Sequence, residues 1–212
     1  MATLLFTDTF PEGGSLALDA TSPQRYTQRL GGGSGYKIIE RVAGMIKSSV
    51  GAPAAYSVNN LDVLTNCKTQ IARYMYDGSL QSKFGPALRM QSNGDCYHIG
   101  ISGSNTLTVY KASGGSDVQL GSQNVAGITW THGQTFGMEI EGTTIRAYAA
   151  GVLRFSVTNE TTFASGLAGI MCFTNGNATD LGVAYYVWSL PPAISPPPWG
   201  TMNRLGRALM RG

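Results

Sequence analysis

Residues 136–157 show the clearest alternation of apolar and polar positions in the chain. The first six, F-G-M-E-I-E, are apolar at every second position, the period of a strand with one buried face. Gly142-Thr143 then fits the two-residue loop of a type II′ hairpin. That loop sets Glu139 opposite Arg146 on the solvent side, as a cross-strand ion pair. On the core side it sets Ile140 opposite Ile145 and Met138 opposite Ala147. With V-L-R-F-S-V at its end, the segment predicts a three-stranded β-meander.

Residues 87–102 predict a second hairpin, because Asn93-Gly94 is the strongest short hairpin signal that a sequence offers. A two-residue loop at this point pairs Leu88 with Ile99 and Met90 with Tyr97 on an apolar face. It pairs Arg89 with His98, and Gln91 with Cys96, on the opposite face. Further strands are expected at residues 4–10, 36–46, 67–76, 107–111, 118–125, 166–174 and 183–190, and residues 56–64 are expected to connect strands.

The composition agrees with short strands and tight turns rather than helices. Glycine accounts for 28 of 212 residues, and only 13% of the residues are charged. A chain of this length can bury a substantial core without metal or disulfide support. We therefore expect one all-β domain over residues 1–190, followed by a separate tail over residues 191–212.

The order of these features resembles the concanavalin A-like lectin/glucanase superfamily, in its laminin-G-like, phage-associated jelly-roll branch. The resemblance covers about residues 4–190 and rests on a series of segments: T-D-T-F, A-L-R-M-Q-S-N-G-D-C-Y-H-I-G-I-S, T-L-T-V-Y-K, the 136–157 meander, F-A-S-G-L-A-G-I and V-A-Y-Y-V-W-S-L. It implies a jelly-roll sandwich of two antiparallel sheets. Members of the superfamily include lectins, glycosidases and non-catalytic modules of virions and cell surfaces, so the fold does not select a function.

The charge distribution argues against nucleic-acid binding. Residues 1–190 contain equal numbers of basic and acidic residues, and the net charge of +3 comes from Arg204, Arg207 and Arg211. The sequence has no apolar run of about 18 residues, so no membrane span is expected. It also has no recognisable secretory signal, which predicts synthesis in the cytoplasm.

No cofactor or metal site is expected. Cys67, Cys96 and Cys172 are sparse and widely spaced, which favours reduced, buried thiols, although one disulfide remains open. The loop N-G-N-A-T-D at 175–180 has oxygen ligands that suit calcium. Its residues are equally the usual turn formers, which is the favoured interpretation.

The tail begins with the stiff proline-rich spacer P-P-A-I-S-P-P-P-W. Beyond it, apolar and basic residues fall near opposite sides of a short helical segment. We interpret the tail as an anchor that docks on a capsid or tail protein or on a neighbouring subunit of a homo-oligomer or larger assembly. The residues expected to make this contact are Trp199, Met202, Arg204, Leu205, Arg207, Leu209, Met210 and Arg211.

Two sets of side chains are candidates for chemistry. Glu139 and Glu141 resemble part of the E-x-D-x-x-E strand of the family's glycosidases, but position 144 is Thr. Because Glu139 also faces Arg146, the structural interpretation is favoured, and no catalytic residue is assigned. The second set, Arg89, Gln91, His98 and Tyr76, is the candidate for carbohydrate binding. A solvated sheet face or a subunit contact is the favoured alternative for it.

The resulting functional hypothesis is a non-catalytic structural or adhesion protein of a virion, either a head-decoration or a tail-associated protein. The alternative is a lectin-like carbohydrate-binding module, and a glycoside hydrolase is third.

Overall fold

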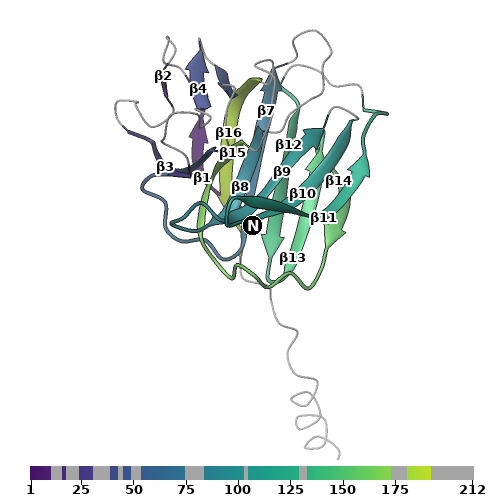
Figure 1. Cartoon of the computed structure of the whole chain (residues 1–212). Coiled ribbons are helices and arrows are strands. Elements are labelled where there is room, and N and C mark those ends of the chain that lie inside the picture. The colour runs from purple at the N-terminus through teal and green to yellow at the C-terminus, as the bar shows by residue number, and fades with distance from the viewer. Residues whose placement is uncertain are drawn as a thin grey trace, which may run out of the picture.

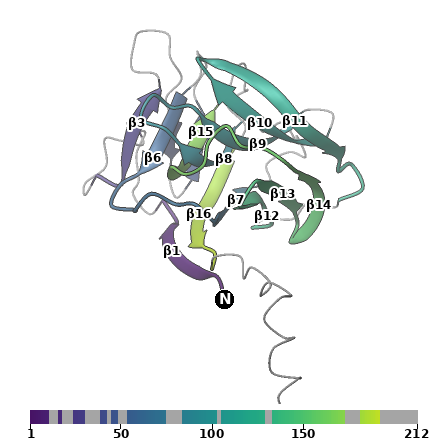
Figure 2. The ribbon, with the colours of Figure 1, turned by 90° about the horizontal axis from the view of Figure 1, so that it is seen from below.

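The computed structural model of the chain describes residues 1–10, 16–17, 24–30, 39–42, 45–48, 54–74, 84–102, 105–128, 133–172 and 181–191. All the named elements in these ranges are β-strands, and neighbouring strands pair in antiparallel fashion. They form two sheets that lie face to face as two layers (Figures 1 and 2). The expected all-β sandwich is therefore confirmed.

The first sheet contains β1 (Thr3–Asp8), β2 (Leu16–Ala17), β4 (Ile39–Val42), β5 (Met45–Ser48), β7 (Cys67–Tyr74), β12 (Thr135–Glu141), β13 (Thr144–Ala149), β14 (Val152–Val157) and β16 (Leu181–Ser189). Their order is β14-β13-β12-β7-β16-β5-β4-β2, and β1 also pairs with β16. Strand β7 thus lies between two strands that come much later in the sequence. This arrangement brings three distant segments of the chain to one continuous surface.

The second sheet contains β3 (Tyr26–Leu30), β6 (Ala54–Val58), β8 (Phe84–Met90), β9 (Cys96–Ser102), β10 (Thr106–Ser113), β11 (Ser116–Asn124) and β15 (Leu167–Cys172). Their order is β11-β10-β9-β8-β15-β6-β3. Figure 2 shows this sheet edge-on above the first one, with β11 near β14 at one side of the sandwich.

The hairpin formed by β12 and β13 has the predicted register. Ile140 pairs with Ile145, and Glu139 pairs with Arg146. Gly142 has a φ of 57°, which suits the first position of a type II′ turn and favours glycine.

The register predicted for the 87–102 hairpin is wrong. His98 pairs with Ala87 rather than with Arg89, and Tyr97 pairs with Leu88. Arg89 has a φ of 52°, a left-handed conformation that interrupts the ladder of a regular strand. The prediction also assumed a two-residue loop at Asn93-Gly94, whereas the Gln91 amide donates to the Asp95 carbonyl oxygen and leaves residues 92–94 in the loop.

The strand expected over residues 36–46 is also wrong, because β4 and β5 pair with each other. Val42 lies opposite Met45, and Arg41 lies opposite Ile46, so the chain reverses direction within this segment.

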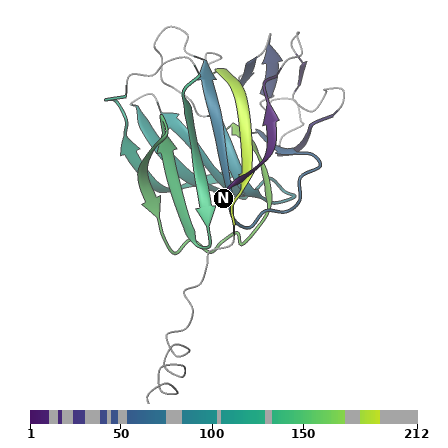
Figure 3. The same ribbon diagram turned by 180° about the vertical axis from the view of Figure 1, so that it is seen from behind.

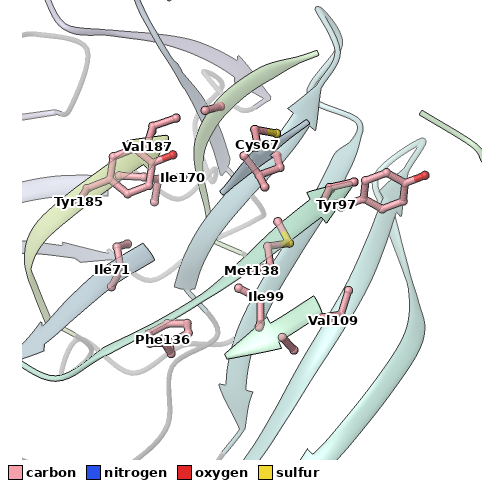
Figure 4. Packing of buried hydrophobic residues seen from close by; sticks show 14 of the residues in the cluster. Cys67, Ile71, Tyr97, Ile99, Val109, Phe136, Met138, Ile170, Tyr185 and Val187 are labelled. Atoms are coloured by element: carbon pink, nitrogen blue, oxygen red, sulfur yellow. The ribbon is translucent and has the colours of Figure 1, made fainter. Parts of the chain in front are cut away.

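Side chains from both sheets form the core between the layers. Figure 4 shows Ile71, Phe136 and Met138 from the first sheet near Ile99 and Val109 from the second. The thiols of Cys67 and Cys96 are free and buried, as predicted, and burial raises the pKa of Cys67 to about 12.

Several predictions concern residues outside the described ranges. These are the carbohydrate role of Tyr76, the calcium alternative for 175–180 and the anchoring residues between Trp199 and Arg211, all of which stay predictions. None of the described residues belongs to a helix with the length and apolar character needed to cross a membrane.

Candidate functional site

The side of the first sheet that points away from the core carries two rows of side chains. In the first row, Arg146, Glu139, Lys68 and Trp188 are consecutive partners on β13, β12, β7 and β16. In the second row, the partners on the same strands are Tyr148, Gly137, Gln70 and Tyr186. We call this surface, together with Glu141, the outer face. Figure 3 shows the molecule from this side, with β16 in yellow beside β1 in purple.

Two carboxylates of the outer face share one guanidinium group. Arg146 Nη1 donates to Glu139 Oε1 at 2.9 Å and to Glu141 Oε2 at 3.0 Å. The two accepting oxygens therefore lie within about 6 Å of each other, since both contact the same nitrogen. The hydrogen bond with Glu141 is the main reason that the pKa of Arg146 is raised. All three side chains retain some exposure to solvent, from 18% for Glu139 to 34% for Glu141.

Aromatic rings lie beside these charges. Tyr186 and Trp188 stack with ring centroids 5.7 Å apart. Lys68 Nζ lies 5.2 Å from the ring centroid of Tyr148 and 5.5 Å from that of Trp188. The Tyr148 hydroxyl donates to Glu139 Oε2 at 3.4 Å, which joins the aromatic part of the face to the carboxylates. Burial, followed by the charge of Glu139, raises the pKa of Tyr148.

Gly137 leaves one position of the second row without a side chain. A Cβ at this residue would lie 2.0 Å from the carbonyl oxygen of Thr69 and 2.8 Å from the Cα of Gln70. The site therefore requires glycine for close backbone approach rather than for a special φ. As a result, bare backbone separates Tyr148 from Gln70 in the middle of the outer face.

The turn that follows Glu141 is held from both sides. Arg89 Nη2 donates to the carbonyl oxygen of Gly142 at 2.8 Å, and the Gly142 amide donates to Asn66 Oδ1 at 2.9 Å. Arg89 also donates to the carbonyl oxygens of Thr65 and Phe163. Its burial lowers the pKa of the guanidinium, and only 2% of the residue is exposed.

The other predicted carbohydrate-binding residues are also engaged within the protein. Gln91 Nε2 donates to the carbonyl oxygens of Arg89 and Ser165, both at 2.8 Å. His98 is 2% exposed, contacts Asp117 through Nε2 at 2.9 Å and stacks on Tyr110. Arg89, Gln91 and His98 therefore do not form one accessible face, and their contact with a glycan stays a prediction.

Sequence reasoning missed the aromatic residues of the outer face. Tyr186 and Trp188 alternate with the core residues Tyr185 and Val187, and this period was visible in V-A-Y-Y-V-W. The missing information was that β16 lies next to β7, so that these rings come near Lys68 and Tyr148. In the described ranges, no group of three or more His, Cys, Asp and Glu residues is placed to hold a metal ion.

Neither a protein-family model nor a curated protein matches this sequence. Solved structures with a similar fold include an endo-β-1,3-glucanase from Pyrococcus furiosus, with a TM-score of 0.57 and 13% identity over 90% of this chain and 95% of that one. The carbohydrate-binding module CBM66 from Bacillus subtilis gives 0.54 and 12%, over 77% and 91%. The laminarinase catalytic domain from Thermotoga maritima gives 0.55 and 11%, over 90% and 99%.

The fold is a concanavalin A-like jelly roll. Identities this low establish the architecture alone. The predicted phage-associated type of this fold finds no support in these structures.

The same structures overturn the hypothesis of a non-catalytic virion component, and they overturn the exclusion of an enzyme. Several of the solved structures that share the fold are endo-1,3-β-glucanases or laminarinases. The exclusion of an enzyme arose because the Glu139–Arg146 pair was interpreted as scaffold alone. That pair in fact lies on the same face as Lys68, Tyr148 and Trp188.

Proposed function

We propose that the protein binds a glycan on the outer face of its first sheet. One observation carries the proposal: three aromatic rings lie beside charged and amide groups on one partly exposed surface. These residues are Lys68, Gln70, Glu139, Glu141, Arg146, Tyr148, Tyr186 and Trp188. Binding sites for small molecules typically combine apolar and aromatic contact area with a few well-placed polar groups.

Sugars can bind such a surface because they make two kinds of contact with a protein. Their C–H faces are apolar and pack on aromatic rings, and their hydroxyl groups exchange hydrogen bonds with carboxylates and amides. Here the rings of Tyr148 and Trp188 lie on either side of Lys68, and Gln70 lies in the neighbouring row. The carbohydrate-binding module and the glucanases that share the fold support a glycan as the ligand.

A second candidate is hydrolysis of a glycosidic bond by Glu139 and Glu141. The favouring observation is that their oxygens lie within about 6 Å, close to the roughly 5–5.5 Å between the carboxyl groups of retaining glycosidases. In such a reaction one carboxyl group donates a proton to the leaving oxygen while the other attacks the sugar, and water, deprotonated by the first group, then hydrolyses the resulting glycosyl-enzyme. Turnover would require the Arg146 guanidinium, which bridges the pair, to release at least one of them.

Calorimetry with β-glucan oligosaccharides and a glycan array tests the binding proposal. The double variant Tyr148→Ala, Trp188→Ala should lose at least about tenfold in affinity, because aromatic rings supply most of the apolar contact. Val118→Ala is the matched control, since Val118 is 52% exposed on β11 in the second sheet. No binding of the wild type to any glycan, or equal affinity in the double variant, would overturn the proposal.

Release of reducing ends from the glycan that binds separates hydrolysis from binding alone. Hydrolysis predicts product that disappears in Glu139→Gln and in Glu141→Gln even at glycan concentrations that saturate each variant. Product that both variants still form would show that these carboxylates are not responsible.

A further inference from the structure

Lys68 is the charged residue at the centre of the outer face. It lies on β7, between Glu139 on β12 and Trp188 on β16. Its ammonium group lies over two aromatic rings, at 5.2 Å from the Tyr148 centroid and 5.5 Å from the Trp188 centroid. The Lys68 residue as a whole is half-buried.

The neighbouring carboxylate is hydrogen-bonded to other groups and makes no ion pair with this cation. Glu139 is the strand partner of Lys68, but Glu139 Oε1 accepts from Arg146 and its Oε2 accepts from the Tyr148 hydroxyl. Glu141 also bonds to Arg146. Among the residues that the structure describes, no carboxylate forms an ion pair with Lys68.

The two rings stabilise the ammonium without using its hydrogen-bonding capacity. An ammonium group has three N–H donors, and a contact with the face of a ring leaves them able to bond to an oxygen. The rings also restrict the flexible Lys68 side chain before any ligand arrives. A ligand anion would therefore meet a cation that has already lost much of its conformational freedom.

A ligand that covers Lys68 also removes water from it. Burying a charge without an opposite charge is costly, whereas burying it against an anion in a hydrogen-bonded contact is much less so. A neutral sugar offers only hydroxyl groups at this point. A carboxylate or sulfate group offers both the charge and the acceptor oxygens.

From these contacts we infer that the outer face selects glycans that carry an anionic substituent, a carboxylate or a sulfate, and that Lys68 pairs with it. The inference rests on the proposed glycan-binding function. It assigns specificity to one residue of the same face and treats the Arg146–Glu139–Glu141 group, in which two carboxylates share one guanidinium, as a separate part of it.

Calorimetry with three matched oligosaccharides tests the inference: one neutral, one with a uronic acid and one with a sulfate. The wild type should bind at least one anionic ligand about tenfold more tightly than the neutral one. Lys68→Gln should reduce this preference to near unity, and Lys68→Arg should keep most of it. Raising the salt from about 0.05 M to about 0.5 M should weaken the anionic ligand's binding more than the neutral ligand's.

The outcomes separate the two proposals. Binding of none of the three ligands by the wild type would argue against the glycan-binding function itself. Equal binding of neutral and anionic ligands, or a preference that Lys68→Gln leaves unchanged, would overturn the inference while glycan binding stands. A preference for only the uronic acid or only the sulfate supports it and identifies the substituent.

Discussion

Arg89 donates a 2.8 Å hydrogen bond to the carbonyl oxygen of Gly142, which lies 53 positions later in the chain. This bond connects β8 of the second sheet with the turn that follows Glu141. Arg89 was expected on a ligand-binding surface, but its side chain is buried at the end of the sandwich. Its cationic group satisfies carbonyl oxygens of three separate segments, at Thr65, Gly142 and Phe163.

Replacing Arg89 should destabilise the fold strongly. In Arg89→Met, three carbonyl oxygens lose their hydrogen bonds from a buried guanidinium, and we expect a loss of about 3–5 kcal/mol in the free energy of unfolding. Urea denaturation followed by circular dichroism measures it. Arg154→Met is the control, because Arg154 is half-buried on β14 and bonds to a single carbonyl oxygen. Similar losses of stability in both variants would contradict this special contribution of Arg89 to the fold.

Gly137→Ala should disturb the middle of the first sheet. The added Cβ would contact the carbonyl oxygen of Thr69, which is backbone and can move only if β7 and β12 separate. We expect a loss of about 1–3 kcal/mol in stability, as for other overpacked sites. Gly127→Ala is the matched control, because no atom lies within 4 Å of its added Cβ. Thermal unfolding of both variants checks this, and an unaffected Gly137→Ala would show that the two strands adjust freely.

Stability should fall at high pH, in part through Tyr97. Burial raises the pKa of Tyr97 to about 12, against about 10 in an unfolded chain. The unfolded state therefore loses this proton first, and the contribution of Tyr97 is complete below about pH 10 and is lost between about pH 10 and 12. Urea denaturation across this range should show a steeper fall in the wild type than in Tyr97→Phe. Parallel falls in the two proteins would argue against a role for Tyr97.

The thiols of Cys67 and Cys96 should resist alkylation while the protein is folded. Both are buried, and burial raises the pKa of each, so little thiolate forms at neutral pH. In a Cys172→Ser background, iodoacetamide at about pH 8 should label neither thiol in native protein and both in about 6 M urea. Mass spectrometry counts the labels. Rapid labelling of the native variant would contradict the burial of one of them.

Local patterns were sufficient to predict how β12 pairs with β13, two strands joined by a two-residue turn. The 136–157 meander illustrates this, since apolar alternation and the Gly142 turn together determine that Glu139 meets Arg146. The same reasoning failed for Arg89. Its left-handed backbone conformation accompanies contacts with carbonyl oxygens 24 to 74 positions away, which no local pattern reveals.

The sequence by itself determined the all-β class, the buried faces of β12 and β13 and the pairing between these two strands, because these depend on side-chain period and turn chemistry between near neighbours. Only the tertiary structure decided that β7 lies between β12 and β16. That order brings Lys68 between Tyr148 and Trp188, which lie 80 and 120 positions later in the chain. The candidate site exists because long-range strand pairing, set by the packing of the whole sandwich, assembles residues that are unrelated in sequence.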